Sequence, residues 1–159
     1  MTSADLQQFI DLHRIRATIL RVDAHTGTVG DAARALGVAD RQIIKSLVFL
    51  VDGRGLLVIN NGPGRVDRRK LAAAVGVGRR RVKFATAQQA LVLTGYVVGS
   101  MPPFGHRRKL HTIVDAAVAE LDVVFGGGGD IDAMLRLTPA ELLRATTAQV
   151  CAVSEIPRK

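Results

Sequence analysis

The sequence has few aromatic and sulfur-containing side chains. Its 159 residues include no Trp, one Tyr, five Phe and a single cysteine, Cys151. The shortage of aromatic rings argues against an extended platform on which the bases of a single nucleic-acid strand would stack. One cysteine cannot form an internal disulfide, and such scarcity is typical of proteins from a reducing compartment. We expect Cys151 to be a buried, unreactive thiol in an apolar strand.

The sequence also lacks long apolar runs. None approaches the ~20 residues that a membrane-spanning helix needs, and residues 1–5 show no basic segment followed by an apolar one. We therefore expect a cytoplasmic protein with no signal peptide and no membrane partner. With 48% apolar side chains, no internal repeat and no linker, residues 1–159 are predicted to form a single domain.

Short apolar segments are mixed irregularly with short amphipathic ones. We predict strands over residues 17–22, 43–51, 56–60, 79–84, 111–114, 121–125, 133–137 and 149–153. We predict helices over residues 3–13, from 28 onward, 67–75, 87–91 and 138–144, with N-caps at Ser3, Thr28, Asp67 and Thr138. This mixture predicts an α+β fold, with a mixed, curled β-sheet or partial barrel and short surrounding helices.

Acidic residues are nearly absent from the middle of the chain. Between Arg65 and Lys109 there are eleven Lys or Arg residues and one acid, Asp67, so the charge of this segment is +10. Because the net charge of the whole chain is +8, the remaining residues together carry −2. A basic band on an otherwise balanced protein predicts a polyanionic partner, most often a nucleic acid. The alternative is a solvated face of an arginine-rich protein.

Lys45 is the one charge within an apolar strand over residues 43–51. A lysine on a buried strand is costly unless its ammonium group reaches water, a partner or an anionic ligand. Lys45 is therefore a candidate for ligand binding. The alternative is a lysine near a strand end whose ammonium group reaches solvent.

The segment over residues 94–109 combines three glycines, two consecutive prolines, His106 and a closing basic triplet. Pro103 fixes its own φ and restricts Pro102, while the glycines allow backbone conformations closed to other residues. We predict a rigid loop whose backbone amides are available to a ligand, with cations directly behind it. The alternative is a structural turn between strands, and His106 either lines the pocket or lies on the surface.

The motifs of several enzyme classes are missing. Gly126 to Gly129 is not followed by Lys-Ser/Thr or by a helix, so it is neither a P-loop nor a dinucleotide fingerprint, and we predict a flexible hairpin-like connection there. The four histidines show no metal-ligand spacing, and no Gly-x-Ser-x-Gly elbow occurs. We expect no metal and no cofactor. An enzyme with this sequence would work by positioning and electrostatics.

Motifs along nearly the whole chain resemble one family in residue type and in order. They are Leu36-Gly37-Val38 before Ile43-Ile44-Lys45-Ser46-Leu47-Val48-Phe49, Val66-Asp67-x-x-Lys70-Leu71 with Gly76, Thr94-Gly95-Tyr96-Val97-Val98-Gly99, Pro103-Phe104-Gly105-His106, Asp115, and Leu137-Thr138-Pro139-x-x-Leu142-Leu143. The chain is similar to the YbaK/EbsC-like aminoacyl-tRNA deacylases, free-standing relatives of the editing domain of bacterial prolyl-tRNA synthetases.

This resemblance implies a trans-editing hydrolase that is independent of metal. It would cleave the ester joining a wrong amino acid to a tRNA, most often tRNA(Pro), with prolyl-tRNA synthetase as a possible partner. In the branch of the family that removes cysteine, an acidic residue opens the strand before the C-terminal helix. Here Ala133 and Met134 stand at that place, and Asp130 and Asp132 lie a few residues earlier. The resemblance therefore does not imply an activity specific for cysteine, and a small amino acid of the Cys, Ala, Ser or Thr type remains open. Two alternatives on the same fold are a non-catalytic tRNA- or synthetase-binding module and a binder of small metabolites.

The resemblance also implies roles for individual residues. The family's strand lysine and its Gly-x-x-x-Pro loop correspond to the catalytic candidates Lys45, Gly99 and Pro103. The candidates for substrate binding are Ser46, Tyr96, Ser100, Phe104, Gly105 and His106, Ser46 being the weaker because it alternates to the other face of the strand. The candidates for tRNA binding are Arg68, Arg69, Lys70, Arg79, Arg80, Arg107, Arg108 and Lys109. Backbone N–H groups of the loop would stabilise the negative charge that develops on the ester oxygen.

Overall fold

The computed structural model describes residues 1–23 and 26–155, and its strands form two sheets. The larger sheet has the order β4-β2-β3-β5-β8, with bounds Val82–Phe84, Ile44–Val51, Arg54–Asn61, His111–Asp115 and Gln149–Cys151. The smaller sheet has the order β1-β7-β6, with bounds Ala17–Arg21, Ala133–Leu137 and Val124–Gly127.

The larger sheet is mixed. Strand β2 pairs antiparallel with β3 and β4, whereas β3 pairs parallel with β5, and β5 with β8. One parallel bridge between Ile43 and Phe125 links the two sheets. The predicted α+β class is confirmed, and within the described residues the two sheets do not close into a barrel.

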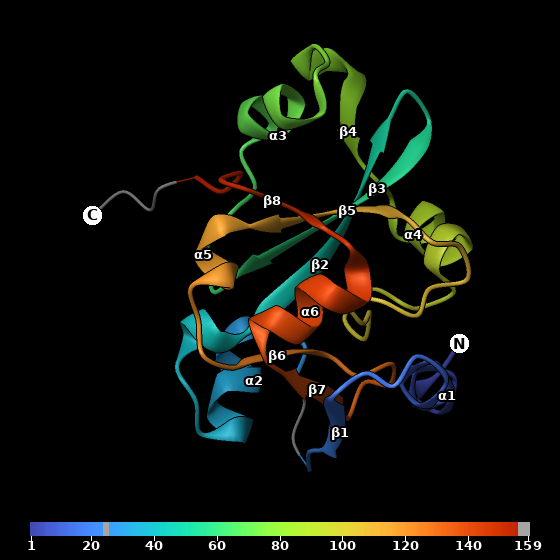
Figure 1. Cartoon of the computed structure of the whole chain (residues 1–159), viewed down its shortest axis with the longest axis vertical. Coiled ribbons are helices and arrows are strands. Elements are labelled where there is room, and N and C mark those ends of the chain that lie inside the picture. Colours follow the sequence, from blue (N-terminus) through green and yellow to red (C-terminus); the bar gives the residue numbers. More distant parts are fainter. Residues whose placement is uncertain (24–25, 156–159) are drawn as a thin grey trace.

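Short helices cover the sheets (Figure 1). Their bounds are α1 Ser3–Leu12, α2 Val29–Leu36, α3 Arg68–Val75, α4 Ala87–Thr94, α5 Ala116–Ala119 and α6 Pro139–Thr146, with 3₁₀ turns η1 Asp40–Gln42 and η2 Arg79–Arg81. Figure 1 shows α6 across the larger sheet, α3 beside β4 at the top, and α1 and α2 flanking the smaller sheet. No helix among the described residues is long and apolar enough to cross a membrane.

The larger sheet is buried on both faces because its side chains alternate. Leu57 of β3 packs in the main core with Leu142 of α6, together with residues of α1 and of the smaller sheet. Its neighbour Val58 packs on the opposite face with Leu71 of α3. The alternation also separates Lys45, on the α3 face, from Ser46 on the face of the main core.

Most helix caps agree with the sequence. Thr28, Asp67 and Thr138 accept backbone N–H hydrogen bonds at the starts of α2, α3 and α6. The first cap differs, because Thr2 rather than Ser3 accepts the Ala4 N–H and Asp5 completes a capping box.

Several predicted boundaries were wrong. Residues 79–81 form a 3₁₀ turn rather than the start of a strand, and β6 runs from Val124 to Gly127 instead of over 121–125. The last strand ends at Cys151, and α5 was missed because it is a single turn that Asp115 caps. Cys151 is half-buried rather than buried.

The glycine tetrad lies at the predicted hairpin, because β6 and β7 pair antiparallel on either side of residues 128–132, but its first two glycines belong to a strand. Gly126 and Gly127 belong to β6, and a Cβ on Gly127 would overlap the carbonyl group of Met101. Gly129 has a positive φ and donates its N–H to the Ser100 carbonyl over 2.9 Å. These glycines allow β6 to pack directly against the backbone of the loop over residues 95–110.

Candidate active site

Lys45 lies near the start of β2, directly opposite Asn60 of β3. Its Nζ donates a hydrogen bond of 2.5 Å to the Gly64 carbonyl, in the turn that follows β3. Burial lowers the pKa of Lys45 below its usual value, and the positive charge of Arg65 lowers it further. The ammonium group is thus held in a partly desolvated position with one backbone acceptor.

Backbone hydrogen bonds fix the loop over residues 95–110. The Arg107 N–H donates to the Thr94 carbonyl over 2.8 Å, which closes the loop at its base. The Ser100 N–H donates to the Val97 carbonyl over 3.1 Å, and Gly99 between them has a φ of +97°. The loop is therefore a shaped element, and Gly99 takes a conformation that other residues rarely adopt.

One cavity of about 240 Å³, which we call the lysine cavity, joins β2 to this loop. Lys45, Ser46 and Gly99 all line it. The start of α2, Met101, Gly127 and Met134 form mainly apolar walls around them. The Ser46 Oγ is buried and has no hydrogen-bond partner within the described residues.

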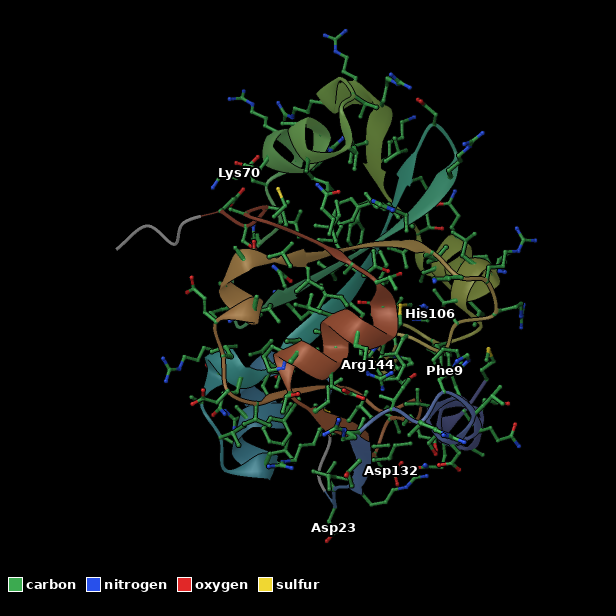
Figure 2. The ribbon with its side chains drawn as sticks, in the orientation of Figure 1. Phe9, Asp23, Lys70, His106, Asp132 and Arg144 are labelled. Carbon is green, nitrogen blue, oxygen red and sulfur yellow. The ribbon has the colours of Figure 1, made fainter. Side chains whose placement is uncertain are left out.

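A second cavity of about 200 Å³, the histidine cavity, lies between the loop, α1 and the end of α6. Phe9, Phe104 and His106 line it, and Figure 2 shows Phe9 and His106 on the same side of the molecule. The His106 Nε2 lies 2.7 Å from the Pro102 carbonyl. Because a carbonyl can only accept, Nε2 carries the hydrogen. Burial lowers the pKa of His106, which favours the neutral ring.

These features agree with the comparison to known proteins. A sequence profile of the aminoacyl-tRNA editing domain matches residues 23–145. The chain belongs to this family. The predicted resemblance is confirmed over most of the chain.

Individual relatives of the editing domain carry functional names. The chain is 30% identical over 145 residues to the multifunctional Ser/Thr-tRNA deacylase ProXp-y of Escherichia coli, covering 87% of this chain and 86% of that protein. It is 24% identical over 123 residues to EbsC of Enterococcus faecalis, a proposed Cys-tRNA(Pro)/Cys-tRNA(Cys) deacylase, covering 77% and 74%. A solved structure proposed to be a trans-editing enzyme for prolyl-tRNA synthetase has a TM-score of 0.87 and 32% identity, covering 97% of both chains.

The structure of the editing domain divides the predicted site residues into three groups. Lys45, Ser46 and Gly99 line the lysine cavity. Pro103, Phe104, Gly105 and His106 line the histidine cavity. Tyr96 and Ser100 are buried and line neither of these cavities.

Tyr96 is a core residue of the editing domain. Its side chain is fully buried, its ring stands edge-on to His106 at 6.1 Å between centroids, and its Oη has no hydrogen-bond partner within the described residues. Burial, with smaller effects from Asp5 and Asp130, raises the pKa of Tyr96 to about 12. Tyr96 therefore stays neutral and supports the loop from inside.

The predicted basic band forms two surfaces that lie apart (Figure 2, where Lys70 and His106 mark them). The first, the α3 surface, is a hollow lined by Arg68, Arg69 and Arg79, together with the acidic residues Asp67 and Glu155. Two of the predicted tRNA-binding residues of α3 bind backbone carbonyls instead, because Arg68 donates to the Val82 carbonyl over 2.5 Å and Lys70 to the Ser154 carbonyl over 3.0 Å. The second, the loop surface, consists of the exposed residues 107–109 next to the histidine cavity.

The sequence motifs did not identify several residues that surround Lys45. Asn60 and Gly64 share its hydrogen-bond network, and Thr28 and Val29 form a wall of the lysine cavity. The cross-strand pairing of the hairpin, with Asn60 opposite Lys45, was the signal that could have identified Asn60. Among the described residues, no three His, Cys, Asp or Glu side chains gather in a group that could hold a metal ion.

Proposed function

We propose that this editing domain hydrolyses the ester bond of a mischarged aminoacyl-tRNA in trans, acting in the cytoplasm on tRNA(Pro). The observation that carries the proposal is that Lys45 and Gly99 line the same cavity in a chain of this family. The names of the deacylase relatives support the reaction type, and the solved relative supports prolyl-tRNA synthetase as the functional partner.

The chemistry of this cavity is electrostatic. Water attacks the ester carbon, which places negative charge on the carbonyl oxygen. The bond to the ribose oxygen then breaks, and that oxygen takes up the proton that the water loses, passed through the neighbouring ribose hydroxyl. The Ser100 N–H is already donated to Val97, so the Gly99 amide is the proposed donor to the carbonyl oxygen, with Pro103 limiting the mobility of the loop. Lys45 supplies a cation for the terminal phosphate or ribose. No protein base is required in this scheme.

The walls of the lysine cavity suit a small amino acid. Val29, Ala32 and Met134 are apolar, and the cavity of about 240 Å³ must also admit the terminal ribose. The buried Ser46 Oγ can form a hydrogen bond to the substrate. A side chain of the Cys, Ala, Ser or Thr type therefore fits the proposal.

The α3 surface is the proposed binding site for the acceptor stem. Arg65 is close enough to lower the pKa of Lys45, and the hollow with Arg68, Arg69 and Arg79 follows it along the chain. In this proposal these cations contact phosphates of the acceptor stem, whose 3′ end reaches Lys45.

A panel of mischarged tRNAs tests the function. We expect the protein to release at least one of Cys, Ala, Ser and Thr from tRNA(Pro) far faster than buffer does, and to leave Pro-tRNA(Pro) intact. A non-catalytic binding module would bind tRNA with a steep salt dependence and release nothing, and a metabolite binder would show no affinity for tRNA. Either result would refute the proposed hydrolase.

A further inference from the structure

Asn60 is an unusual residue for its position. It lies within β3 and its side chain is completely buried, yet its Oδ1 has no hydrogen-bond partner within the described residues. A buried amide with an unpaired oxygen is costly, and an apolar residue would fill the same space without that cost. The amide therefore requires an explanation beyond packing.

The nitrogen of the Asn60 amide, unlike its oxygen, forms hydrogen bonds. The Asn60 Nδ2 donates to the Gly64 carbonyl over 3.0 Å, and the Lys45 Nζ donates to the same oxygen over 2.5 Å. Asn60 and Lys45 are also direct neighbours across β2 and β3. One carbonyl thus joins the cation of the lysine cavity to a fixed side chain of the sheet.

The network continues from Asn60 into the C-terminal segment. Its Nδ2 lies 3.4 Å from the Ser154 Oγ, and the Ser154 N–H donates to the buried carboxylate of Asp115 over 3.1 Å. Lys70 donates to the Ser154 carbonyl, and Figure 2 shows Lys70 beside this segment. The anchor of the network is Asp115, which also accepts the Val153 N–H over 2.8 Å.

We infer that Asn60 is a positioning residue that fixes the Gly64 carbonyl and through it the Lys45 ammonium group. The inference rests on the proposed function only for its catalytic consequence. Without the amide, the Gly64 turn is released and the ammonium group loses its fixed acceptor.

The reactivity of the Lys45 amine tests this without tRNA. The folded protein is treated with a limiting amine-acylating reagent, and the rate at Lys45 is measured by mass spectrometry relative to the exposed Lys83 of β4. In Asn60→Ala we expect the Lys45 rate to rise roughly fivefold, since one hydrogen bond that fixes its acceptor is removed. Asn61→Ala is the matched control, because the Asn61 Nδ2 also donates to a backbone carbonyl, that of Arg41 over 2.8 Å, on a different element.

A second variant predicts the opposite sign. In Asn60→Asp a carboxylate faces the Lys45 ammonium group, which raises the pKa of Lys45 and slows its acylation. The other charged groups around this network, the cations Arg65 and Lys70 and the carboxylate Asp115, are the same in both variants. A residue that only filled space would change the rate in the same direction in both variants. If Asn60→Ala does not fold, Ser154→Ala removes the next hydrogen bond and is expected to raise the rate by a smaller factor.

Deacylation forms the second arm of the experiment. We expect Asn60→Ala to lose more than tenfold in kcat, because a misplaced cation weakens transition-state binding, while Asn61→Ala keeps the rate of the unmodified protein. Equal Lys45 acylation in Asn60→Ala and Asn61→Ala overturns the inference. A clear difference in acylation, in a protein that deacylates no mischarged tRNA, supports the inference and refutes the proposed function instead.

Discussion

The two cavities on either side of the loop over residues 95–110 differ in how their polar groups are used. In the histidine cavity three polar side chains, those of His106, Thr112 and Thr146, each form a hydrogen bond with a nearby backbone carbonyl. In the lysine cavity the Ser46 Oγ has no partner within the described residues, and Lys45 has one backbone acceptor. Satisfied polar groups stabilise a fold, whereas unsatisfied ones next to a cavity are available to a ligand.

The origin of the walls explains this difference. The lysine cavity lies where α2, β2 and the smaller sheet meet, so its residues come from both sheets. The histidine cavity is lined by α1, the loop and the end of α6, with aromatic rings such as Phe9 and Phe104, which stack at 5.8 Å between centroids. We infer that one face of the loop binds substrate and the other anchors the loop to the fold.

The largest effect is expected from removing the cation of the lysine cavity. Lys45→Ala should lower kcat/KM for deacylation roughly 10²- to 10³-fold, the usual loss when one group that stabilises the transition state is removed. The variant should stay folded, because it relieves the partial burial of a charge. Single-turnover deacylation and circular dichroism measure the two properties.

Lys109→Ala is the matched control for this comparison, since Lys109 lines the histidine cavity. Its deacylation rate should stay within about threefold of the unmodified protein, because Lys109 lies outside the lysine cavity and outside the α3 surface proposed for the acceptor stem. Full activity in Lys45→Ala would remove Lys45 from the mechanism, and equal losses in both variants would contradict the division between the cavities.

The two basic surfaces should differ in their contribution to tRNA affinity. Replacing Arg69 and Arg79 by alanine should weaken binding roughly tenfold and reduce the slope of log K against log salt by about one unit for each phosphate that is no longer neutralised. The double variant Arg107→Ala/Arg108→Ala is expected to have a smaller effect, because these residues lie next to the histidine cavity. Filter binding over a range of salt concentrations measures both slopes. A larger effect from the loop surface would reverse the proposed orientation of the tRNA.

Local signals in the sequence predicted much of the fold. The caps at Thr28, Asp67 and Thr138 were identified correctly because each depends on hydrogen bonds within one turn. The hairpin of β2 and β3 followed from its apolar pattern and its turn. Boundaries were less accurate at β6, which extends through Gly127 because its pairing with the next strand, β7, continues to that residue.

The site was harder to predict, because its division depends on packing between distant segments. The run over residues 94–109 is continuous, and nothing local shows that Gly99 and His106 line different cavities. Glycines in β6 look flexible in the sequence, yet they allow close contact with Met101 and Ser100. Asn60 becomes informative only when Lys45 and Gly64 are beside it in space.

The smallest effect is expected at His106, and it concerns stability more than activity. Burial holds the pKa of folded His106 below its value in the unfolded chain, near 6.5, so the unfolded chain binds more protons in this range. Stability should therefore fall as the pH drops through about 6.5. His106→Gln can still donate to the Pro102 carbonyl and does not titrate, so it should lose part of this pH dependence. Urea unfolding between pH 7.5 and 5.5 measures the difference.

The deacylation activity of His106→Gln distinguishes a structural role of His106 from a catalytic one. All other side chains are the same in both proteins, so only the contribution of His106 differs between the two unfolding profiles. Deacylation by His106→Gln at pH 7.5 should stay within about threefold of the unmodified protein, since the ring bonds Pro102 and lines the cavity away from Lys45. A hundredfold loss with unchanged stability would place His106 among the catalytic residues and make the two faces of the loop one site.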